Sequence, residues 1–514
     1  MHQGSFTMSE NRRFLILNPI DDVMIALQPL LKSERVNEID ILDNIPPEHK
    51  VALRPIAKGK PVHRYGQVIG FATQDILAGQ HVHTQNLAYG EFDKDYRFCE
   101  DYRPTKYVET PDTFMGIVRD DGRVATRNYI GILTSVNCAA TVAHAIADRF
   151  RRDIFPEALA DFPNVDGVVA LSHGVGCGID SSGEGIQVLR RTIAGYVRHA
   201  NFAAILIIGL GCETNQISGL LKSEALAEGC NLQTFTIQEV GGTPKSIAKG
   251  MEIIKGMLPD ANRYKRTQVP VGHLKIGMQC GGSDSYSGIT ANPVLGAAMD
   301  ILIRNGGTAI LSETPEIYGA EHLLTCRAVN RQVGNKLVGV IDWWKDVCER
   351  NNASMNNNPS AGNKAGGLTT VLEKSLGGVA KCGTTGLMQV YDYAESVTEK
   401  GFVFMNTPGY DPMSATGQVA GGANLICFTT GRGSAFGCVP SPSLKLATNN
   451  ALWKRQEDDM DFNCGSVIDG AQIEDLGRQF YELILRCASG EQSKSEIYGY
   501  GQNEFVPWQP SIIC

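Results

Sequence analysis

Residues 203–229 read AAILIIGLGCETNQISGLLKSEALAEG. The stretch begins with an unbroken apolar run, turns at glycines, and continues into a segment whose apolar residues recur with helical spacing. An apolar run of this kind, followed by an amphipathic helix, is typical of a parallel strand that is buried on both faces. The stretch therefore predicts an α/β unit in which helices cover a parallel sheet.

The same order of strand and helix recurs on both sides of this stretch. YIGILTSV (129–136) precedes CAATVAHAIADRFRRDIF (138–155), and VDGVVALS (165–172) precedes a glycine-rich turn. The pattern resumes with LKIGMQCGGSD (274–284), TAILSETPEI (308–317), FVFMNTPG (402–409) and ANLICFTTG (423–431). We predict two α/β units with largely parallel sheets, over 114–258 and 270–512, joined at the hydrophilic stretch 258–269.

The N-terminal part of the chain has a different pattern. Short β runs such as FLILN, DDVMIAL, HKVALRPI and HVHTQN are separated by Pro, Gly and Asp, which predicts a small β-rich domain over 11–86. Residues 87–113 show no sustained period and are expected to form a connecting segment that crosses a surface. The Asn- and Gly-rich tract 351–370 is interpreted as an ordered active-site loop.

Composition narrows the classes of partner. The 514 residues carry a formal net charge of -8, which gives no reason to expect nucleic acid or an anionic membrane as a partner. The N-terminus lacks the apolar core of a signal peptide, and the apolar runs are too short for a membrane span, so a cytoplasmic protein is expected. Most of the fourteen cysteines are then expected to be reduced thiols.

Three cysteines share one local setting: Cys177, Cys212 and Cys280 each follow an apolar strand in a glycine-containing turn. Ligands of open α/β sheets bind beyond the carboxyl ends of the strands, so these thiols would converge if their strands are neighbours. The alternative is that small residues simply pack at such turns. The polar residues that accompany the cysteines, and that we predict as further metal or substrate ligands, are His173, Glu213, Ser283 and Asp284.

Thiolate, imidazole and carboxylate ligands together suit Fe(II) or Mn(II) better than Mg(II), and three thiols also suit an iron-sulfur cluster. No Cys-x-x-Cys spacing accompanies these three cysteines, which argues against a structural zinc. His81 and His83 lie two residues apart in HVH and are expected on one face of a strand, as metal ligands or as a solvated pair.

Cationic side chains lie in two glycine-rich segments. Lys364 and Lys374 lie on or beside the tract 351–370, where Asn363 and backbone N–H groups would help to cradle a carboxylate or hydroxyl. Arg432, in TGRGSAFG, is our candidate for binding a substrate carboxylate, because a guanidinium pairs with a carboxylate through two hydrogen bonds. The signatures of a P-loop and of a dinucleotide-binding fold are absent, which argues against a nucleotide-dependent oxidoreductase.

Taken together, GVGCGID, GLGCETNQ, CGGSDSYSGITANP, SETPEIYGAEHLL, NNPSAGNKAGGLTTVLEKSLG and FTTGRGSAFG closely resemble motifs of the altronate and galactarate dehydratase family. The resemblance extends from about residue 14 to the last helix, and the N-terminal part resembles the family's SAF domain. SETPEIYGAEHLL and the HVH pair are more similar to altronate dehydratases.

The resemblance implies a small-molecule sugar acid as substrate, most closely D-altronate, with galactarate or another hydroxy acid as the alternative. It also implies a divalent metal, Fe(II) or Mn(II). Dehydration removes the C2 proton and the C3 hydroxyl, and our catalytic candidates are His173, Lys364 and Lys374, with His173 or Lys364 as the general base. A sugar-acid binding protein without activity is the alternative from another class, and any assembly is expected to be a homo-oligomer.

Overall fold

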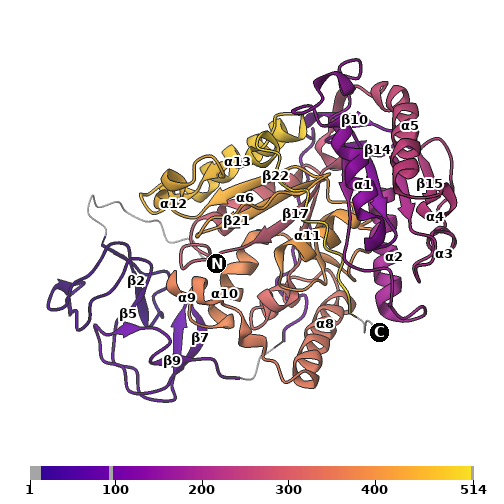
Figure 1. The fold of residues 1–514 in the computed structure, drawn as a ribbon. Coiled ribbons are helices and arrows are strands. Elements are labelled where there is room, and N and C mark those ends of the chain that lie inside the picture. Colours follow the sequence, from indigo (N-terminus) through magenta and orange to yellow (C-terminus); the bar gives the residue numbers. More distant parts are fainter. Residues whose placement is uncertain (1–12, 92–95, 511–514) are drawn as a thin grey trace.

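The computed structural model describes residues 13–91 and 96–510, which form an α/β protein with a β-rich N-terminal domain (Figure 1). That domain contains the antiparallel sheet β1-β2-β5-β8, the sheet β6-β7-β9 and the hairpin β3-β4. This part of the fold prediction is confirmed. The strands are β1 (Phe14–Leu15), β2 (Val23–Ala26), β3 (Arg35–Val36), β4 (Ile39–Asp40), β5 (Lys50–Ala52), β6 (Pro61–Arg64), β7 (Gln67–Ala72), β8 (His81–Val82) and β9 (Leu87–Ala88).

The second domain has a parallel four-stranded sheet of order β13-β12-β14-β15. Its strands are β12 (Tyr129–Thr134), β13 (Gly167–Leu171), β14 (Phe202–Gly209) and β15 (Leu232–Thr236). Every residue of β14 is buried, as its unbroken apolar sequence predicts. The helices α1 (Ala140–Ala147) and α5 (Thr243–Asn262) pack with one core cluster, and α2 (Glu184–Val197) and α3 (Ile217–Ser223) with another.

Two helices of this domain are shorter than the sequence indicated. The segment 138–155 is α-helical only to Ala147, and the segment 212–229 only from Ile217 to Ser223. Residues before α3 are held in a turn instead, because the Gln216 side chain donates to the backbone oxygens of Gly211 (3.2 Å) and Glu213 (2.6 Å). Side-chain bonds of this kind compete with helix formation.

The expected joint at 258–269 is part of the regular structure. Helix α5 continues to Asn262, and β16 (Arg266–Pro270) pairs with β10 (Thr113–Val118), which also pairs with β11 (Val124–Ala125). The connection between the α/β domains is therefore a strand in an antiparallel sheet and not a free hydrophilic linker.

The C-terminal domain has a parallel seven-stranded sheet of order β19-β20-β18-β17-β21-β22-β23. Helices α6 and α13 pack with one core cluster, and α11 packs with another together with α2 of the second domain. The strands are β17 (Lys275–Cys280), β18 (Thr308–Leu311), β19 (Leu387–Tyr391), β20 (Gly401–Met405), β21 (Leu425–Thr430), β22 (Ser443–Ala447) and β23 (Phe462–Asn463). The larger helices are α6 (Ala291–Arg304), α8 (Arg331–Arg350), α10 (Val371–Gly378), α11 (Asp411–Ala420) and α13 (Ile473–Ala488).

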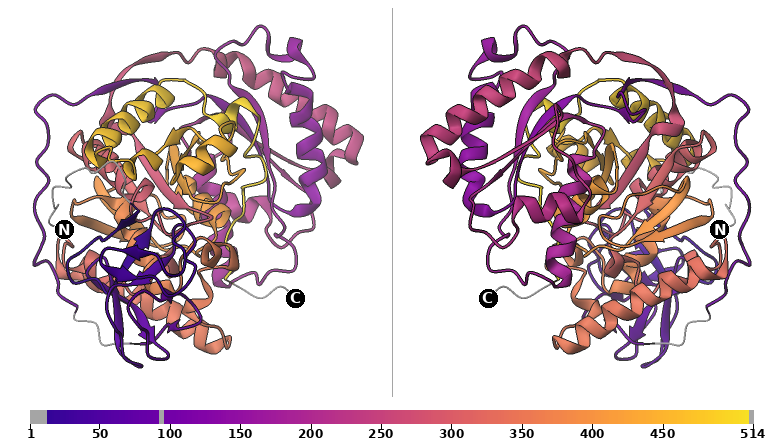
Figure 2. Two further views of the ribbon diagram at one scale, coloured as in Figure 1. Left: turned by 90° about the vertical axis from the view of Figure 1, so that its left-hand side faces the viewer. Right: turned by 90° about the vertical axis from the view of Figure 1, so that its right-hand side faces the viewer.

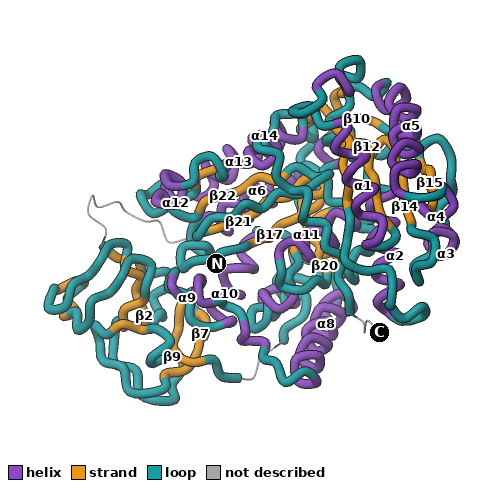
Figure 3. The backbone as a smooth tube through the Cα atoms, in the orientation of Figure 1, coloured by secondary structure: helices purple, strands orange, loops and turns teal. Residues whose placement is uncertain are grey.

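The remaining helices are single turns or little more, as the tube drawing shows (Figure 3). They are α4 (Ile237–Val240), α7 (His322–Thr325), α9 (Ala361–Ala365), α12 (Asn450–Arg455) and α14 (Lys494–Ile497). The tract 351–370 thus contains a short helix, α9, and its serine and asparagine form a capping box at Ser360 and Asn363. Among the helices of the described chain, none combines the length and apolar character of a membrane span.

Leu87–Ala88, expected in the connecting segment, form β9 and pair with β7 of the N-terminal domain. From residue 96 onward the segment runs along the outside of the C-terminal domain (Figure 2). Its backbone N–H groups at Cys99 and Val108 donate to Thr325 (3.1 Å) and Arg304 (3.0 Å). The N-terminal domain, in turn, docks on helix α10, where Val62 and Ile69 join the same core cluster as Val371.

Candidate active site

The candidate site lies where the chain reverses its direction across the seven-stranded sheet. Strands β18, β20 and β19 lie on one side of β17 in the sheet. The strands that follow them in the chain, β21, β22 and β23, lie on the other side of β17. The carboxyl ends of β17 and β21 therefore flank a topological switch point, the usual ligand position in such sheets. The loops after the two strands are joined, because the N–H groups of Gly431 and Arg432 donate to the oxygen of Gly282 (3.1 and 3.0 Å).

The loop after β17 is fixed around the buried carboxylate of Asp284. This carboxylate accepts hydrogen bonds from Ser287 Oγ (2.9 Å), Thr448 Oγ1 (2.7 Å) and Asn449 Nδ2 (3.0 Å), and burial raises its pKa. A Cβ at Gly431 would lie 2.1 Å from Asp284 Cγ, so only glycine fits there.

Asn363 holds the same loop from the side of α9. Its Nδ2 donates to the oxygen of Ser283 (2.8 Å), and its Oδ1 accepts from the N–H of Ser360 (3.0 Å). The structure thus brings together the predicted residues Ser283, Asp284 and Asn363, with the Asn363 amide engaged in positioning the loop.

The N-terminal domain contributes three consecutive residues, Glu48, His49 and Lys50. Burial and the nearby carboxylate of Asp284 raise the pKa of Glu48 to about 8, and Arg432 opposes this shift. His49 Nε2 lies 3.3 Å from the oxygen of Ala365, and Lys50 Nζ donates to the oxygen of Gly367 (2.6 Å). The site is therefore built between two domains.

Two cationic side chains at the site have no partner among the described residues. No hydrogen bond or ion pair of the Arg432 guanidinium or the Lys364 ammonium occurs within 13–91 and 96–510. Arg432 is exposed, and Lys364 is partly exposed in α9. Both charges are available to a carboxylate from solution.

Three imidazoles cluster beside α9. The ring centroids of His49 lie 5.0 Å from His81 and 4.9 Å from His83, and those of His81 and His83 lie 5.5 Å apart. Burial lowers the pKa of His49 and of His81 to about 4, and it also lowers that of His83. All three rings are therefore neutral near pH 7, which is the form that binds a metal ion.

Backbone carbonyls set the tautomers of two of these rings. A carbonyl only accepts, so His49 donates from Nε2 to Ala365, and His83 donates from Nε2 to Lys364 (2.9 Å). Their Nδ1 lone pairs face away from those bonds, and His49 Nδ1 lies 2.9 Å from His81 Nε2. Donation of the second ring N–H to a carbonyl is the usual support of a metal-binding histidine. His49 and His81 therefore offer two close nitrogens for a metal ion, whereas His83 Nδ1 lies 3.1 Å from Thr84 Oγ1, and the three rings do not form a group within 4.8 Å in the described chain.

A second group of ligand-type atoms is buried behind Cys280. Within the described chain, Cys280, Glu313 and Glu316 offer atoms that all lie within 4.8 Å of one another. Lys381 Nζ lies 2.9 Å from Cys280 Sγ and 3.0 Å from Glu313, and Lys374 Nζ lies 2.6 Å from Glu316.

Two ammonium groups face the two carboxylates of this group. Burial raises the pKa of Glu313 to about 7, and it also raises the pKa of the Cys280 thiol and keeps that thiol neutral. The spacing of these atoms would suit one ion, but the two lysine ammonium groups already occupy the positions next to them. Lys374, predicted as a catalytic residue, is 6% exposed at its side chain and paired here.

The other predicted thiols lie elsewhere. Cys177 follows β13 and Cys212 follows β14, both in the sheet of the second domain, whereas Cys280 ends β17 in the other sheet. The convergence was expected only if the three strands are neighbours, and the strand of Cys280 does not meet this condition. Cys177 and Cys212 are exposed and Cys280 is buried.

Two polar residues near those thiols are tied to the backbone of the second domain. His173 Nε2 donates to Thr134 (3.0 Å), while its Nδ1 accepts from Val175 (3.3 Å), and burial lowers its pKa to about 4. Glu213 accepts from Ser135 Oγ and from the N–H of Gly211, both at 2.6 Å. These contacts leave neither ring nitrogen of His173 free for a substrate proton.

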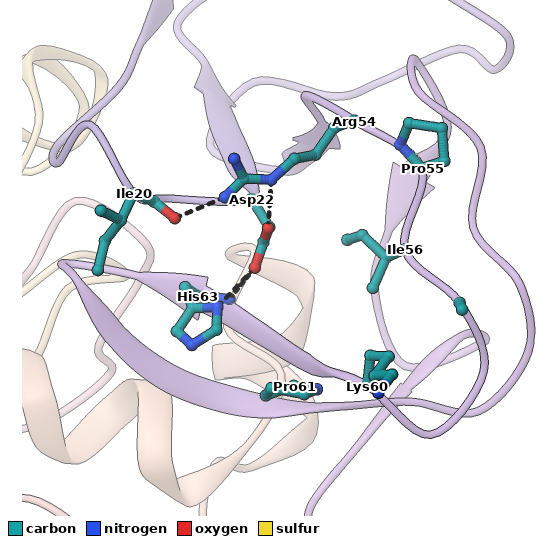
Figure 4. Close-up of a pocket in the computed structure, with 9 residues that line it drawn as sticks. Ile20, Asp22, Arg54, Pro55, Ile56, Lys60, Pro61 and His63 are labelled. Carbon is teal, nitrogen blue, oxygen red and sulfur yellow. Dashed lines mark hydrogen bonds and ion pairs between the residues drawn. The ribbon is translucent and has the colours of Figure 1, made fainter.

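A surface pocket of about 410 Å³ lies on the N-terminal domain (Figure 4). Its polar groups are already paired, since Asp22 accepts from Arg54 Nε (2.6 Å) and contacts His63 Nδ1 (2.7 Å). None of the candidate-site residues lines this pocket.

Sequence reasoning missed Glu48, His49, Glu313, Glu316 and Lys381. Glu48 and His49 follow two prolines without a repeating pattern, and nothing local indicates that this turn faces another domain. Glu313 and Glu316 follow the strand β18, so the rule that functional residues follow parallel strands would have found them.

Comparison with known proteins agrees with this architecture. Three family models match: "Altronate/galactarate dehydratase SAF domain" over 12–90, "D-galactarate dehydratase/Altronate hydrolase, second domain" over 116–262, and "D-galactarate/Altronate dehydratase, C-terminal" over 271–513. Altronate dehydratase of Bacillus subtilis (strain 168) is 34% identical over 96% of this chain and 97% of its own.

Two proteins of Escherichia coli (strain K12) are also similar. Its altronate dehydratase is 33% identical over 94% of this chain and 97% of its own length. Its galactarate dehydratase (L-threo-forming) is 36% identical over 92% of both chains. The chain therefore belongs to the altronate and galactarate dehydratase family.

Proposed function

We propose that this protein is a hydro-lyase that converts a sugar acid, D-altronate in the first place and galactarate as the alternative, to a 2-keto-3-deoxy acid and water. Relatives with both names match more than nine-tenths of the chain. The observation that carries the proposal is the position of Glu48, whose pKa is raised to about 8, near the carboxylate of Asp284 and the unpaired guanidinium of Arg432.

Arg432 and Lys364 would bind the substrate carboxylate. A guanidinium binds a carboxylate through two parallel hydrogen bonds, and a second cation adds attraction and fixes the orientation of the acid. The rigid loops after β17 and β21 hold Arg432 in place through the Gly282 carbonyl. The sugar chain of the substrate would then extend toward Glu48 and the imidazoles.

Glu48 would supply the proton that the departing C3 hydroxyl needs. With a pKa of about 8, this carboxyl is protonated at neutral pH. Transfer of its proton to the departing hydroxyl would release water while a base of the site accepts the C2 proton, and the resulting enol would tautomerise to the keto acid.

We further propose that His49 and His81, whose Nδ1 and Nε2 atoms lie 2.9 Å apart, hold the divalent metal that the family resemblance implies, Fe(II) or Mn(II), and that His83 joins them after a change of its ring position. Imidazole ligands suit Fe(II), whereas Mn(II) prefers oxygen ligands, so the histidines favour iron. When bound, such an ion acts as a Lewis acid that stabilises negative charge on the oxygens of the substrate. The neutral rings and the carbonyl-directed tautomers of His49 and His83 support this assignment.

Turnover under anaerobic conditions tests the activity. The purified chain is supplied with altronate or galactarate and with Fe(II), Mn(II) or a chelator, and keto-acid formation is followed. Metal-dependent product from one acid establishes the dehydratase and identifies its substrate. No product from either acid, with metal bound, would contradict both activities.

Metal content tests the assigned ligands. His49→Ala should lower the affinity for Fe(II) or Mn(II) by about 10–100-fold or more, since a ligand matters at least as much as its supporting partner. The matched control is His63→Ala, in the same domain but bonded to Asp22. Equal metal content in both variants after dialysis would place the metal elsewhere.

A further inference from the structure

The exposed thiols of the protein are unevenly distributed. Of the thirteen cysteines that the structure describes, four are exposed: Cys138, Cys177, Cys212 and Cys230. The first three follow the adjacent strands β12, β13 and β14, whose order in the sheet is β13-β12-β14. Parallel strands end at the same edge of their sheet, so the three cysteines follow their strands at one edge of the second domain.

Hydrogen bonds join every pair of the three loops that carry these thiols. Asn137, beside Cys138, donates from its N–H to the oxygen of Val175 in the Cys177 loop (3.0 Å). Asn215, in the Cys212 loop, donates from its N–H to Gly176 (2.9 Å) and from Nδ2 to Ser135 (3.1 Å). The three loops are therefore joined to one another, and the backbones that carry the cysteines are held together.

Local geometry restricts these loops further. Gly176 and Gly178 flank Cys177 with φ of +106° and +70°, and a Cβ at Gly176 would lie 2.2 Å from the oxygen of Ser135. Gln238 Nε2 lies 3.3 Å from Cys212 Sγ, so one sulfur already receives an amide hydrogen bond. Hydrogen bonds to sulfur are one of the means by which proteins tune thiolate-bound metal centres.

Simple packing does not account for this arrangement. A free cysteine used only as a small apolar residue is normally buried, as seven other described cysteines of this chain are. The three sulfurs also do not form a group within 4.8 Å among the described residues, the spacing at which one ion could bind all of them. An iron-sulfur cluster is wider than one ion and holds its thiolates farther apart.

We propose that Cys138, Cys177 and Cys212 bind an iron-sulfur cluster with one iron free of protein thiolate. The sequence pattern had grouped Cys177 and Cys212 with Cys280, which lies in the other sheet; in the proposed site the third thiol is that of Cys138. It is separate from the imidazole cluster of the N-terminal domain, and its occupancy can be measured without turnover.

The test uses the full chain, isolated anaerobically from iron-supplied cells. We expect iron and acid-labile sulfide in equal amounts, with the broad sulfide-to-iron charge-transfer absorption of such clusters. Each of Cys138→Ser, Cys177→Ser and Cys212→Ser should lose the sulfide and the absorption. Cys230→Ser is the matched control, because Cys230 is exposed but lies at the opposite, amino-terminal end of β15.

Melting temperatures are measured in parallel, so that loss of the cluster is separated from loss of the fold. Retention of sulfide in the three variants would overturn the proposal, as would equal loss in Cys230→Ser. Iron or zinc bound without sulfide would overturn it as well. Because none of these measurements uses altronate, the result is distinct from the outcome of the dehydratase assay.

Discussion

Glu48 combines a constrained backbone with an unusual acidity. Its φ is 74°, and a Cβ at Gly367 would lie 2.4 Å from its carbonyl oxygen, so the two domains hold this residue between them. A residue with positive φ costs roughly 1–3 kcal/mol unless its surroundings require that conformation. The constraint directs a carboxyl with a pKa of about 8 toward Asp284 and Arg432.

We predict that Glu48→Gln lowers kcat on the preferred sugar acid by about 10²–10⁴-fold, since an amide of the same size cannot donate the proton. In the wild type, kcat/KM should fall as the pH rises through about 8, because Glu48 is then ionised. Steady-state rates measured against pH check both expectations.

The matched control is Glu38→Gln, which changes another glutamate of the same domain with positive φ (63°) that is exposed. It should leave the rate and the pH profile unchanged. If Glu48→Gln kept the wild-type rate, Glu48 would have no role in proton transfer.

At the scale of elements, the carboxyl ends of β17 and β21 are held together by close backbone packing. Gly431 lies against the Asp284 carboxylate, with only 2.1 Å between the place of its missing Cβ and Asp284 Cγ. We predict that Gly431→Ala displaces the loop, lowers the free energy of unfolding by about 1–3 kcal/mol and raises KM. Thermal melting and steady-state kinetics measure the two effects.

Gly339→Ala is the control for this change. Gly339 lies in α8 with nothing within 4 Å of its missing Cβ, so alanine should leave the stability unchanged or raise it by up to roughly 1 kcal/mol. An unchanged KM and melting temperature in Gly431→Ala would show that the loop adapts to the methyl group.

The elements also show what the sequence can predict. Strands such as β14 and β21 were predicted because their residues are buried on both faces, and this burial requires unbroken apolar runs. Arg432 and Asp284 were found because they follow such strands. The sequence did not show which strands share a sheet. Cys212 follows β14 and Cys280 ends β17, and these two apolar strands belong to different sheets.

The residues that the N-terminal domain contributes to the candidate site could not be predicted from the local sequence pattern. Glu48 and His49 gain their environment from α9 and the β17 loop, which are more than 200 residues away in the chain. Only the HVH pair gave a local signal, because alternation along a strand brings His81 and His83 to one face.

At the scale of the whole molecule, one buried charge cluster joins the N-terminal domain to the rest. Glu373 of α10 accepts from Lys50 Nζ (2.9 Å) and Arg64 Nη1 (2.5 Å). Despite burial, these cations and the hydrogen bonds of Thr369 lower the pKa of Glu373 to about 2. Glu373 is therefore ionised throughout the physiological range, and two cations of the other domain depend on it.

We predict that Glu373→Gln destabilises the protein by about 3–5 kcal/mol, because Lys50 and Arg64 would remain buried without their anion. The exposed pair Arg486–Glu491 has a similar distance (2.9 Å), and Glu491→Gln should change the melting temperature little. Equal melting temperatures for the two variants would show that the cluster does not contribute to docking of the domains.

Acid stability is a property that involves both the N-terminal and the second domain. Burial lowers the pKa of His49, His81, His173 and His199 from the ordinary 6.5 to about 4. Between these values the folded chain binds fewer protons than the unfolded chain, so the free energy of unfolding falls as the pH drops from 6.5 to 4 and is fully restored above 6.5.

The fully buried His173 and His199 should each account for up to roughly 3 kcal/mol of this loss, at about 1.4 kcal/mol for each unit of pKa shift. His49 and His81 should contribute less, because solvent screens them. Urea unfolding at pH 7, 6 and 5, with a chelator present so that metal binding does not contribute, measures the slope. A flat profile would mean that these imidazoles become protonated without unfolding, and a slope steeper than four protons would require further groups that titrate only on unfolding.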